Sequence, residues 1–259
     1  MNTKTILLSL LCIISITTAT AQNDVWIWKD GYAVKTEMAD SITFTSPALT
    51  GSARALAEAT TKDIGKIIGE DGKIYTTKED AEAAGITAVA MIAYVGNDAE
   101  TNSTYRHGLA LALKDVSGYK SWCSHFLTPC LGTYYSSESA AKGDMAGLAN
   151  TDALVSHISH NHAAAIAARN YKYADDVDEG AHPEVTSAWF LPSTGQWDKM
   201  ATAAGGYANL QTNADLQSLY YWSSSEYNAY DAWYFRADYG FWSCVNLGVN
   251  YLVRPCLAF

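Results

Sequence analysis

Two long apolar runs predict the central strands of the main domain. Residues 86–95 and 107–116 are largely apolar, which is typical of strands buried on both faces. Upstream, residues 64–68 and 73–75 flank a Glu-Asp-Gly turn at 70–72 and are expected to form a hairpin. Sequential strands with few helices favour an α+β domain of short twisted sheets and two to three helices.

Capping signals predict where the helices lie. Residues 76–79 and 193–196 each place Thr or Ser three residues before Glu or Gln, which is the spacing of a capping box. The first helix is expected to end at Gly85 and the second to bury Trp197. A further helix is expected over residues 150–166, with its apolar face turned inward.

The first residues have the pattern of an export signal. Lys4 is followed by an apolar run at 6–16 and by a small-residue Ala-Thr-Ala site at 19–21, so residues 1–21 are expected to be a signal peptide. The apolar run is too short for a stable membrane anchor. We therefore expect an exported chain, secreted or associated with the cell surface, without membrane insertion.

The region after the signal predicts a small module and a linker. Short runs of apolar and aromatic residues indicate three strands within a β module at 22–46, which is too small to be stable alone. These runs are residues 25–28, 32–35 and 40–44. Residues 47–61 are rich in Ala, Ser and Thr and are expected to form a linker, so that the main domain covers 62–259.

The last part of the chain is unusually aromatic. Twelve of the 32 residues from 220 to 251 are Phe, Trp or Tyr, against 12% of the whole chain, and Ser, Asn, Asp, Ala and Gly lie between them. Antibody binding surfaces have this composition, because Tyr and Trp give rigid contact area and the small polar residues adaptable hydrogen bonds. An aromatic-rich β core is the alternative interpretation.

A coding pattern also marks this region. No Lys, Gln, Glu or Met occurs among the 33 residues from Tyr227 to Phe259. An Asn codon AAC whose two adenines are randomised cannot give these four residue types or Trp. Trp233 and Trp242 would then be fixed positions among changeable ones.

These residues carry a resemblance to a known family. Segments 222–228, 232–233 and 253–259 resemble the WSSSEYN, AW and VRP-LAF segments of C-type-lectin-fold variable proteins of diversity-generating retroelements. The Trp-Phe-Leu-Pro-Ser step at 189–193 resembles the strand-to-helix step that precedes them. The resemblance covers roughly residues 62–259.

The resemblance implies a C-type-lectin-like ligand-binding domain with a variable segment at about 220–259. Its ligand would be a protein or another macromolecule. The implied ligand-binding residues are Asn228, Tyr230, Asp231, Tyr234, Arg236, Asp238, Tyr239, Phe241, Ser243, Asn246 and Asn250. The framework residues that are expected to be buried are Trp189, Pro192, Trp197, Trp222 and Trp233.

Charge and motif patterns argue against several other classes. The net charge of −10 at pH 7 repels phosphate backbones, so nucleic acid is not an expected partner. Histidines at 157, 160 and 162 and the acidic loop at 175–179 lack the spacing of zinc or calcium sites, so no metal or cofactor is expected. No motif of nucleophilic or phosphate-transfer catalysis is present in the sequence, and the protein is not expected to be an enzyme.

The cysteines leave two questions open. Cys123, Cys130, Cys244 and Cys256 allow three disulfide pairings, of which Cys123–Cys130 is the only local one. The same fold family includes formylglycine-generating oxidases with paired C-terminal cysteines, which makes such an oxidase one alternative function, although the residues flanking Cys244 and Cys256 differ. An undiversified structural or adhesin surface protein is the other alternative.

Overall fold

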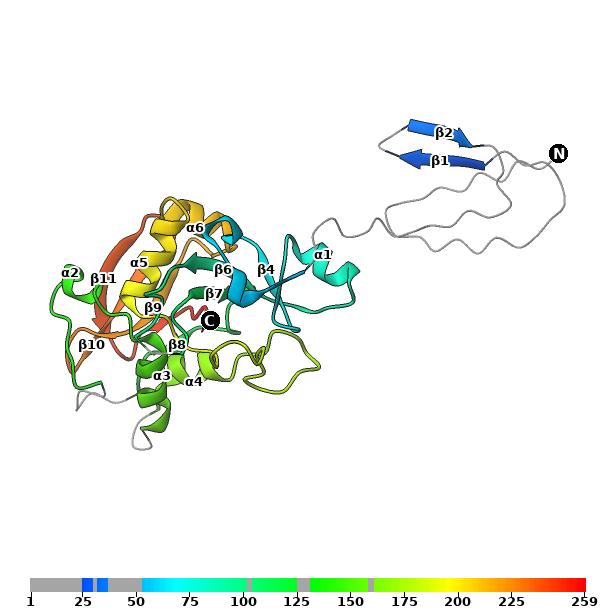
Figure 1. The fold of residues 1–259 in the computed structure, drawn as a ribbon. Coiled ribbons are helices and arrows are strands. Elements are labelled where there is room, and N and C mark those ends of the chain that lie inside the picture. The colour runs from blue at the N-terminus through cyan, green and yellow to red at the C-terminus, as the bar shows by residue number, and fades with distance from the viewer. Residues whose placement is uncertain (1–24, 30–31, 37–52, 102–103, 125–130, 158–160) are drawn as a thin grey trace. The chain divides into compact units, whose positions relative to one another are not determined.

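The computed structural model describes residues 25–29, 32–36, 53–101, 104–124, 131–157 and 161–259 (Figure 1). The chain divides into two compact units, Met1–Thr50 and Gly51–Phe259. In the first unit, β1 (Val25–Lys29) and β2 (Tyr32–Thr36) pair as an antiparallel hairpin, as the sequence predicted. The predicted signal peptide and the predicted strand at 40–44 lie outside the described residues.

The larger unit is built around a six-stranded antiparallel sheet in the order β13-β7-β6-β4-β5-β3. Its strands are β3 (Arg54–Ala55), β4 (Ile67–Gly69), β5 (Lys73–Tyr75), β6 (Ala88–Val95), β7 (Gly108–Ala112) and β13 (Cys256–Ala258). Successive residues of β6 enter different core clusters, with Met91 on one side of the sheet and Ile92 on the other. The predicted burial of both faces is therefore confirmed, and so is the predicted hairpin, as β4–β5.

The domain begins earlier than the sequence predicted. Residues 53–61 were expected to be linker, but β3 pairs with β5, and Leu56 and Ala59 are buried in the core. Only 3-10 helical turns form here, at Leu56–Glu58 and Thr61–Asp63. The composition of this segment, rich in Ala and Thr, did not indicate that it pairs with the sheet. One buried Leu and a few small side chains are enough to hold a two-residue edge strand.

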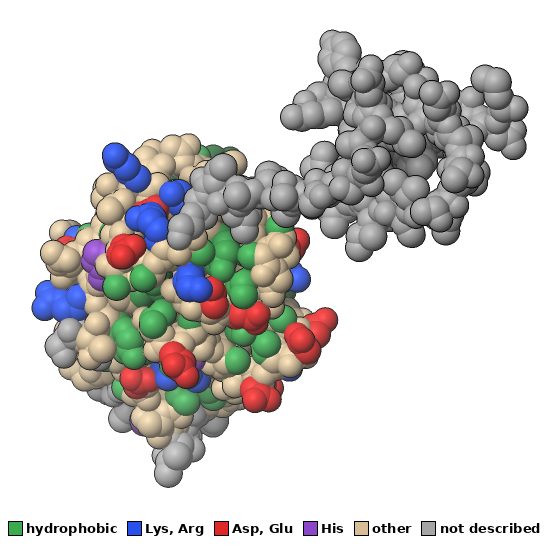
Figure 2. All heavy atoms as spheres, turned by 45° about the vertical axis from the view of Figure 1, so that its right-hand side comes forward, with side chains coloured by type: hydrophobic (Ala, Val, Ile, Leu, Met, Phe, Trp, Pro, Cys, Tyr) green, Lys and Arg blue, Asp and Glu red, His purple; other side chains and the backbone are tan. Residues whose placement is uncertain are grey.

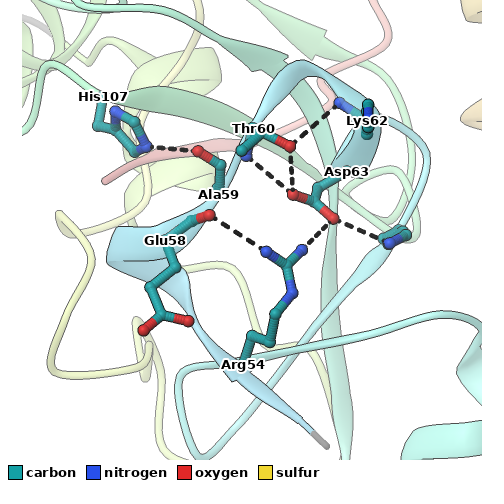
Figure 3. A network of polar contacts seen from close by, with 8 residues as sticks. Arg54, Glu58, Ala59, Thr60, Lys62, Asp63 and His107 are labelled. Carbon is teal, nitrogen blue, oxygen red and sulfur yellow. Dashed lines mark hydrogen bonds and ion pairs between the residues drawn. The ribbon is translucent and has the colours of Figure 1, made fainter. Parts of the chain in front are cut away.

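A buried carboxylate fixes this opening segment (Figure 3). The Asp63 side chain is 1% exposed and forms ion pairs with Arg54 and with Lys66, the latter at 2.9 Å between Nζ and Oδ1. The backbone N–H and the hydroxyl of Thr60 donate to Asp63 Oδ2 at 2.8 and 3.0 Å. Burial alone would raise the pKa of Asp63, but the hydrogen bonds from Lys66, Arg54 and Thr60 outweigh it and lower that pKa well below its usual range.

Asp63 is therefore expected to give the domain acid-sensitive stability. Because its folded pKa is lowered, the charged carboxylate stabilises the fold above the usual Asp range, and this contribution is lost as pH falls toward the folded pKa. At neutral pH, Asp63→Asn should reduce the free energy of unfolding by about 2 kcal/mol. Urea unfolding of both proteins between about pH 7 and pH 3 should show this difference shrinking with acid. Glu82→Gln, in an exposed pair with Lys78, is the control and should change little; a pH-independent difference for Asp63→Asn would contradict the assignment.

Helices cover the sheet and outnumber the two to three that the sequence predicted. The described residues contain α1 (Lys78–Ala83), α2 (Glu138–Ala141), α3 (Gly147–Ser156), α4 (Ala163–Arg169), α5 (Thr194–Ala203) and α6 (Tyr207–Asn213). The predicted box at Ser193 and Gln196 caps α5, and Trp197 is fully buried. The cap of α1 lies one residue later than predicted, at Thr77 with Asp80, while Gly85 follows the helix with a φ of +72°.

The single helix predicted over 150–166 is in fact two helices. The first of them, α3, starts earlier than predicted, at Gly147. A Cβ at this position would lie only 2.0 Å from Gln196 Oε1, so the close packing of α3 on the α5 cap requires glycine. Helix α3 stops at His157, which has a non-helical ψ of 85°, and α4 begins after His162. The His162 ring is buried, with its centre 5.5 Å from that of Trp122 in an edge-to-face contact. This tertiary contact replaces the helical continuation that local periodicity suggested.

The aromatic C-terminal region forms a separate three-stranded sheet. Its order is β11-β10-β9, from β9 (Tyr220–Glu226), β10 (Asp231–Arg236) and β11 (Phe241–Asn246). The pair β12 (Asn250–Tyr251) and β8 (Lys120–Ser121) lies next to it, because a bridge joins Tyr221 to Leu252. Helix α5 packs against both β6 and β9 and so joins the two sheets. The strand predicted at 189–191 is reduced to one bridge between Phe190 and Cys256.

Candidate functional site

The motif residues 222–226 are buried and belong to the framework. Ser223 Oγ donates to the Trp233 carbonyl at 2.9 Å, and Ser225 Oγ donates to Asp144 Oδ2 at 2.6 Å. Asn150 Nδ2 donates to the same Asp144 oxygen at 3.0 Å. Ser224 Oγ accepts from Asn150 Nδ2 at 3.2 Å, so the three serines connect β9 to β10, α3 and the loop before it. Every predicted framework residue, from Trp189 to Trp233, is buried.

A second buried group anchors the chain that follows β12. Arg254 is 2% exposed, and its Nε donates to Asp115 Oδ1 at 2.6 Å. Its remaining nitrogens donate to the carbonyl groups of Ala112, Ala214 and Asp215 at 2.9–3.0 Å. The guanidinium therefore ties the end of β7 to the end of α6 and fixes where β12 and β13 run.

The β10–β11 hairpin has one face turned into the core. Strand pairing places Phe235 opposite Trp242 and Trp233 opposite Cys244. Phe235 is fully buried against Trp197, with ring centres 4.6 Å apart, and Trp233 Nε1 donates to the Tyr135 carbonyl at 2.8 Å. This part of the aromatic composition is core, as the alternative interpretation of the sequence held.

The other face of the same sheet carries a partly exposed aromatic cluster. Pairing places Tyr234 beside Ser243 and Trp222, and Arg236 beside Phe241 and Tyr220, all on the side opposite Phe235. Tyr251 of β12 completes the cluster. We call these outward groups the tyrosine face, which consists of Tyr220, Tyr234, Arg236, Tyr239, Phe241, Ser243 and Tyr251.

Three tyrosines form the centre of this face. The ring centres of Tyr234 and Tyr251 are 4.8 Å apart, those of Tyr220 and Tyr251 are 5.0 Å apart, and those of Tyr220 and Tyr234 are 5.4 Å apart. Buried Trp222 supports Tyr251 from below at 4.9 Å. Burial, together with the nearby Tyr234 hydroxyl, raises the pKa of Tyr251 to about 12.

A charged pair shapes one end of the face. Arg236 donates from Nε and Nη2 to the two carboxylate oxygens of Asp238 at 2.8 and 3.0 Å. The guanidinium carbon lies 4.8 Å from the ring centre of Tyr239 and 5.7 Å from that of Tyr220. Tyr239 and Phe241 are 75% and 57% exposed, so this end presents two aromatic side chains to solvent in a fixed geometry.

The structure divides the eleven residues predicted to bind a ligand. None is buried, yet only Tyr234, Arg236, Tyr239, Phe241 and Ser243 belong to the tyrosine face. Asp238 holds Arg236. The other five residues lie elsewhere: Asn228, Tyr230, Asp231, Asn246 and Asn250.

The turn before β10 explains part of this separation. Asn228 Oδ1 accepts the backbone N–H groups of Tyr230 and Asp231 at 2.7 and 2.9 Å, and its Nδ2 donates to Asp231 Oδ2 at 2.9 Å. Asn246 likewise accepts the Gly248 N–H at 3.0 Å. These side chains shape turns at the opposite end of the hairpin, and only Tyr230, 56% exposed, projects freely there.

Strand alternation explains the rest. Asp231 and Asn246 are paired and lie on the side of Trp233 and Phe235, away from Tyr234. In β12, Asn250 precedes Tyr251 and so points to the other side. The two-residue period of the strands therefore places Asp231, Asn246 and Asn250 away from the side that carries Tyr234. That the eleven residues bind a ligand stays a prediction.

Two tyrosines of the face were missed by the sequence analysis. Tyr220 and Tyr251 lie at the ends of the aromatic stretch and are not among the eleven residues predicted to bind a ligand. Tyr220 could have been found from its spacing, because it precedes the buried Trp222 by two residues and shares its side of β9. Tyr251 carried no such signal, since its place depends on the bridge between β9 and the chain after β12.

The groups considered for other chemistry are dispersed. Cys256 is fully buried in β13, and its thiol donates to the Leu257 carbonyl at 3.3 Å, whereas Cys244 lies in β11 of the other sheet. Both are free thiols, while Cys130 lies outside the described residues. In the part of the chain that the structure describes, no three His, Cys, Asp or Glu side chains gather closely enough to hold a metal ion.

The surface and the helices bear on other partner classes. Figure 2 shows one face of the larger unit. On this face Lys and Arg are interspersed with Asp, Glu and hydrophobic side chains, and the basic side chains of the described residues form no continuous patch. Within the described segments, no helix has both the length and the apolar composition needed to cross a bilayer.

Comparison with known proteins gives a similarity of structure but not of sequence family. No family model matches the sequence, and no curated protein matches it. A search of solved structures finds a fimbrial protein from Bacteroides ovatus ATCC 8483 with a TM-score of 0.50 and 17% sequence identity. The match covers 76% of this chain and 48% of that chain, so this chain aligns with about half of the neighbour's length. This similarity concerns the fold, and with the sheets and helices above it makes the chain a mixed α+β protein that shares a fold with part of a fimbrial protein.

Proposed function

We propose that this chain is an exported, adhesin-like binding protein that presents the tyrosine face to a protein ligand. The observation that carries the proposal is the cluster of Tyr220, Tyr234 and Tyr251 with Arg236, partly exposed on a sheet whose opposite side is core. Monomeric proteins rarely expose contiguous aromatic surface unless it binds something. The proposal assigns no catalytic residue and no cofactor.

The composition of the face favours a protein as the ligand. Tyrosines present large contact areas with only two rotatable side-chain bonds, and Ser243 adds a small polar group between them. Arg236 is held in place by Asp238 before any ligand arrives, which lowers the entropy lost on binding. We expect Tyr234 and Arg236 to contribute most to affinity, since Tyr and Arg are enriched among the dominant residues of interfaces.

The scaffold supports the further proposal of a diversified binding face of C-type-lectin type. A position that is rewritten between relatives must tolerate many side chains, and close-packed cores do not. The hairpin separates these demands, because Trp233, Phe235 and Trp242 are buried in the core while Arg236, Phe241 and Ser243 are partly or largely exposed. Tyr234 is half-buried against the core cluster that contains Trp222. The fixed tryptophans required by adenine-directed change are thus the buried ones.

Two display libraries test whether the partly exposed positions of the hairpin tolerate substitution while the buried positions do not. One library randomises Tyr234, Tyr239, Phe241 and Ser243 on yeast, and the matched library randomises Trp233, Phe235, Ala237 and Trp242. Most clones of the first should be displayed at parental levels and most clones of the second should not, because the second set is buried whereas the first is partly or largely exposed. Selection of the first library against immobilised hen egg lysozyme should yield binders whose binding is lost when the face is restored to the original sequence.

Equal display losses in both libraries would contradict the proposed tolerance, and a displayed library without binders would contradict the proposed binding role.

Gene sequences from sibling isolates test diversification itself. Differences should concentrate at the codons of the tyrosine face, and an even spread along the gene would overturn the diversified form of the proposal.

A structural subunit of a fimbria is a second candidate, favoured by the fimbrial neighbour in the structure search. In that case the tyrosine face would contact another copy of the chain. Sedimentation of the purified chain distinguishes the two, because concentration-dependent association lost in Tyr234→Ala supports a subunit and a monomer at all concentrations supports a receptor-type binding protein.

A further inference from the structure

The three central tyrosines have a geometry that bears on oxidation chemistry. Tyr234 lies in β10 and Tyr251 in β12, two strands that are not hydrogen-bonded to each other. Their ring centres are 4.8 Å apart and their planes meet at 53°. This separation is somewhat larger than that of two phenyl rings joined by a single bond, so a small displacement would bring the two rings to bonding distance.

The hydroxyl groups show which edges of the rings meet. The Tyr234 hydroxyl contributes to the raised pKa of Tyr251, and with the ring centres 4.8 Å apart this places the two hydroxyl-bearing ends near each other. The ring carbons ortho to each hydroxyl are next to those ends, and these are the carbons where a phenoxyl radical carries much of its unpaired electron. Tyr220 is arranged differently. Its ring is perpendicular to that of Tyr234, at 89°, and although its ring centre lies 5.0 Å from that of Tyr251, the guanidinium carbon of Arg236 lies 5.7 Å from the same ring.

Access from solvent completes the requirements. Both tyrosines are partly exposed, so a small oxidant or a surface electron-transfer step can reach them. Trp222 lies 4.9 Å from Tyr251 beneath the pair and keeps its ring from moving away. Of the free thiols near this sheet, Cys256 is fully buried in the other sheet, and Cys244 of β11 pairs with Trp233 on the side of the hairpin away from Tyr234.

We propose that Tyr234 and Tyr251 form a modification site, an intramolecular dityrosine link made when a haem peroxidase and hydrogen peroxide act on the protein. Each phenol loses one electron and its hydroxyl proton, and the two radicals couple through their ortho carbons. The two ortho hydrogens then move to the oxygens, so both hydroxyl groups are restored. In total the protein loses two hydrogen atoms, and one peroxide is reduced to two molecules of water.

The link would act as a covalent staple across the tyrosine face. It would close residues 235–250 into a loop and hold β12 against β10, which removes freedom from the unfolded chain and raises Tm. It would also fix two rings of the face in one arrangement. The proposal concerns only the chemistry of these rings and does not depend on whether the face binds a ligand.

Horseradish peroxidase with hydrogen peroxide tests the proposal on the full purified chain. We expect dityrosine fluorescence in the monomer fraction, a mass decrease of two hydrogen atoms, and a cross-linked peptide pair that contains Tyr234 and Tyr251. Tyr234→Phe and Tyr251→Phe should each abolish the monomer signal while the circular dichroism spectrum stays unchanged, since Phe keeps the ring and its packing. The oxidised wild-type monomer should also show a higher Tm than either oxidised variant.

Tyr239→Phe is the matched control, because Tyr239 is the most exposed of these tyrosines at 75% and has no tyrosine ring beside it in the contacts described. It should leave the signal unchanged. Three results would overturn the assignment: a cross-link confined to dimers, a link mapped to Tyr220 or Tyr239, or a monomer signal that survives Tyr251→Phe.

Discussion

Replacing Trp233 by alanine is expected to lower the free energy of unfolding by about 3–5 kcal/mol, the usual cost of removing a buried Trp side chain. Its side chain is 5% exposed, packs at 5.5 Å from the ring centre of Tyr227, and donates from Nε1 to the Tyr135 carbonyl at 2.8 Å. The substitution would leave a cavity beneath β10 and an unpaired carbonyl. Equilibrium unfolding in guanidinium, followed by circular dichroism, measures the change.

Tyr239→Ala is the control for this experiment. It removes an aromatic ring from the same hairpin, but that ring is 75% exposed, so stability should change little. Similar losses for the two variants would show that the hairpin has no separate core and outer sides. A near-neutral Trp233→Ala would show that this tryptophan is not part of the framework.

Replacing Arg254 by methionine is expected to have an effect of the same size, about 3–5 kcal/mol, because removing one member of a buried ion pair leaves the other charge uncompensated. Asp115 would lose its only ion-pair partner among the described residues. The carbonyl groups of Ala112, Ala214 and Asp215 would lose their donors as well. Because methionine nearly matches the length of arginine, the loss reports on the charge and the hydrogen bonds more than on volume.

Two further variants test whether the loss in Arg254→Met comes from its buried ion pair and hydrogen bonds. Arg254→Lys keeps the charge but cannot reach all four acceptors with one ammonium, so its stability should fall between those of wild type and Arg254→Met. Arg236→Met removes the Asp238 pair on the surface and should leave unfolding nearly unchanged, since ion pairs in solvent contribute little. Equal losses for Arg254→Met and Arg236→Met would contradict the anchoring role of Arg254.

The predictions that failed have a common physical origin. The segment 150–166 has a helical apolar pattern throughout, yet the buried contact between His162 and Trp122 interrupts it. Residues 53–61 have the composition of a linker, yet Asp63 and Leu56 fix them to the sheet. In both cases a contact with a residue distant in sequence, or a single buried charge, outweighs the average preference of the local segment.

The candidate site shows the same division between residues. Composition indicated the aromatic region, and the coding pattern predicted that Trp233 and Trp242 are fixed positions. Both tryptophans are buried. Composition could not distinguish Tyr234 from Asp231, because which residue faces outward depends on the strand register and on the turn that Asn228 forms. The proposed ligand and the proposed diversification are tested by experiment and not by these positions alone.

By itself, the sequence determined the local features of this protein: the buried strands β6 and β7, the capping box at Ser193, the β4–β5 hairpin and the buried tryptophans. Each depends on neighbouring residues or on a simple period, so physical chemistry along the chain is sufficient to predict it. Only the tertiary structure decided the tyrosine face. Its residues come from β9, β10, β11 and β12 and the turn between β10 and β11, and they meet because strand register, the bridge to Leu252 and the buried Arg254 bring together segments that no local pattern connects.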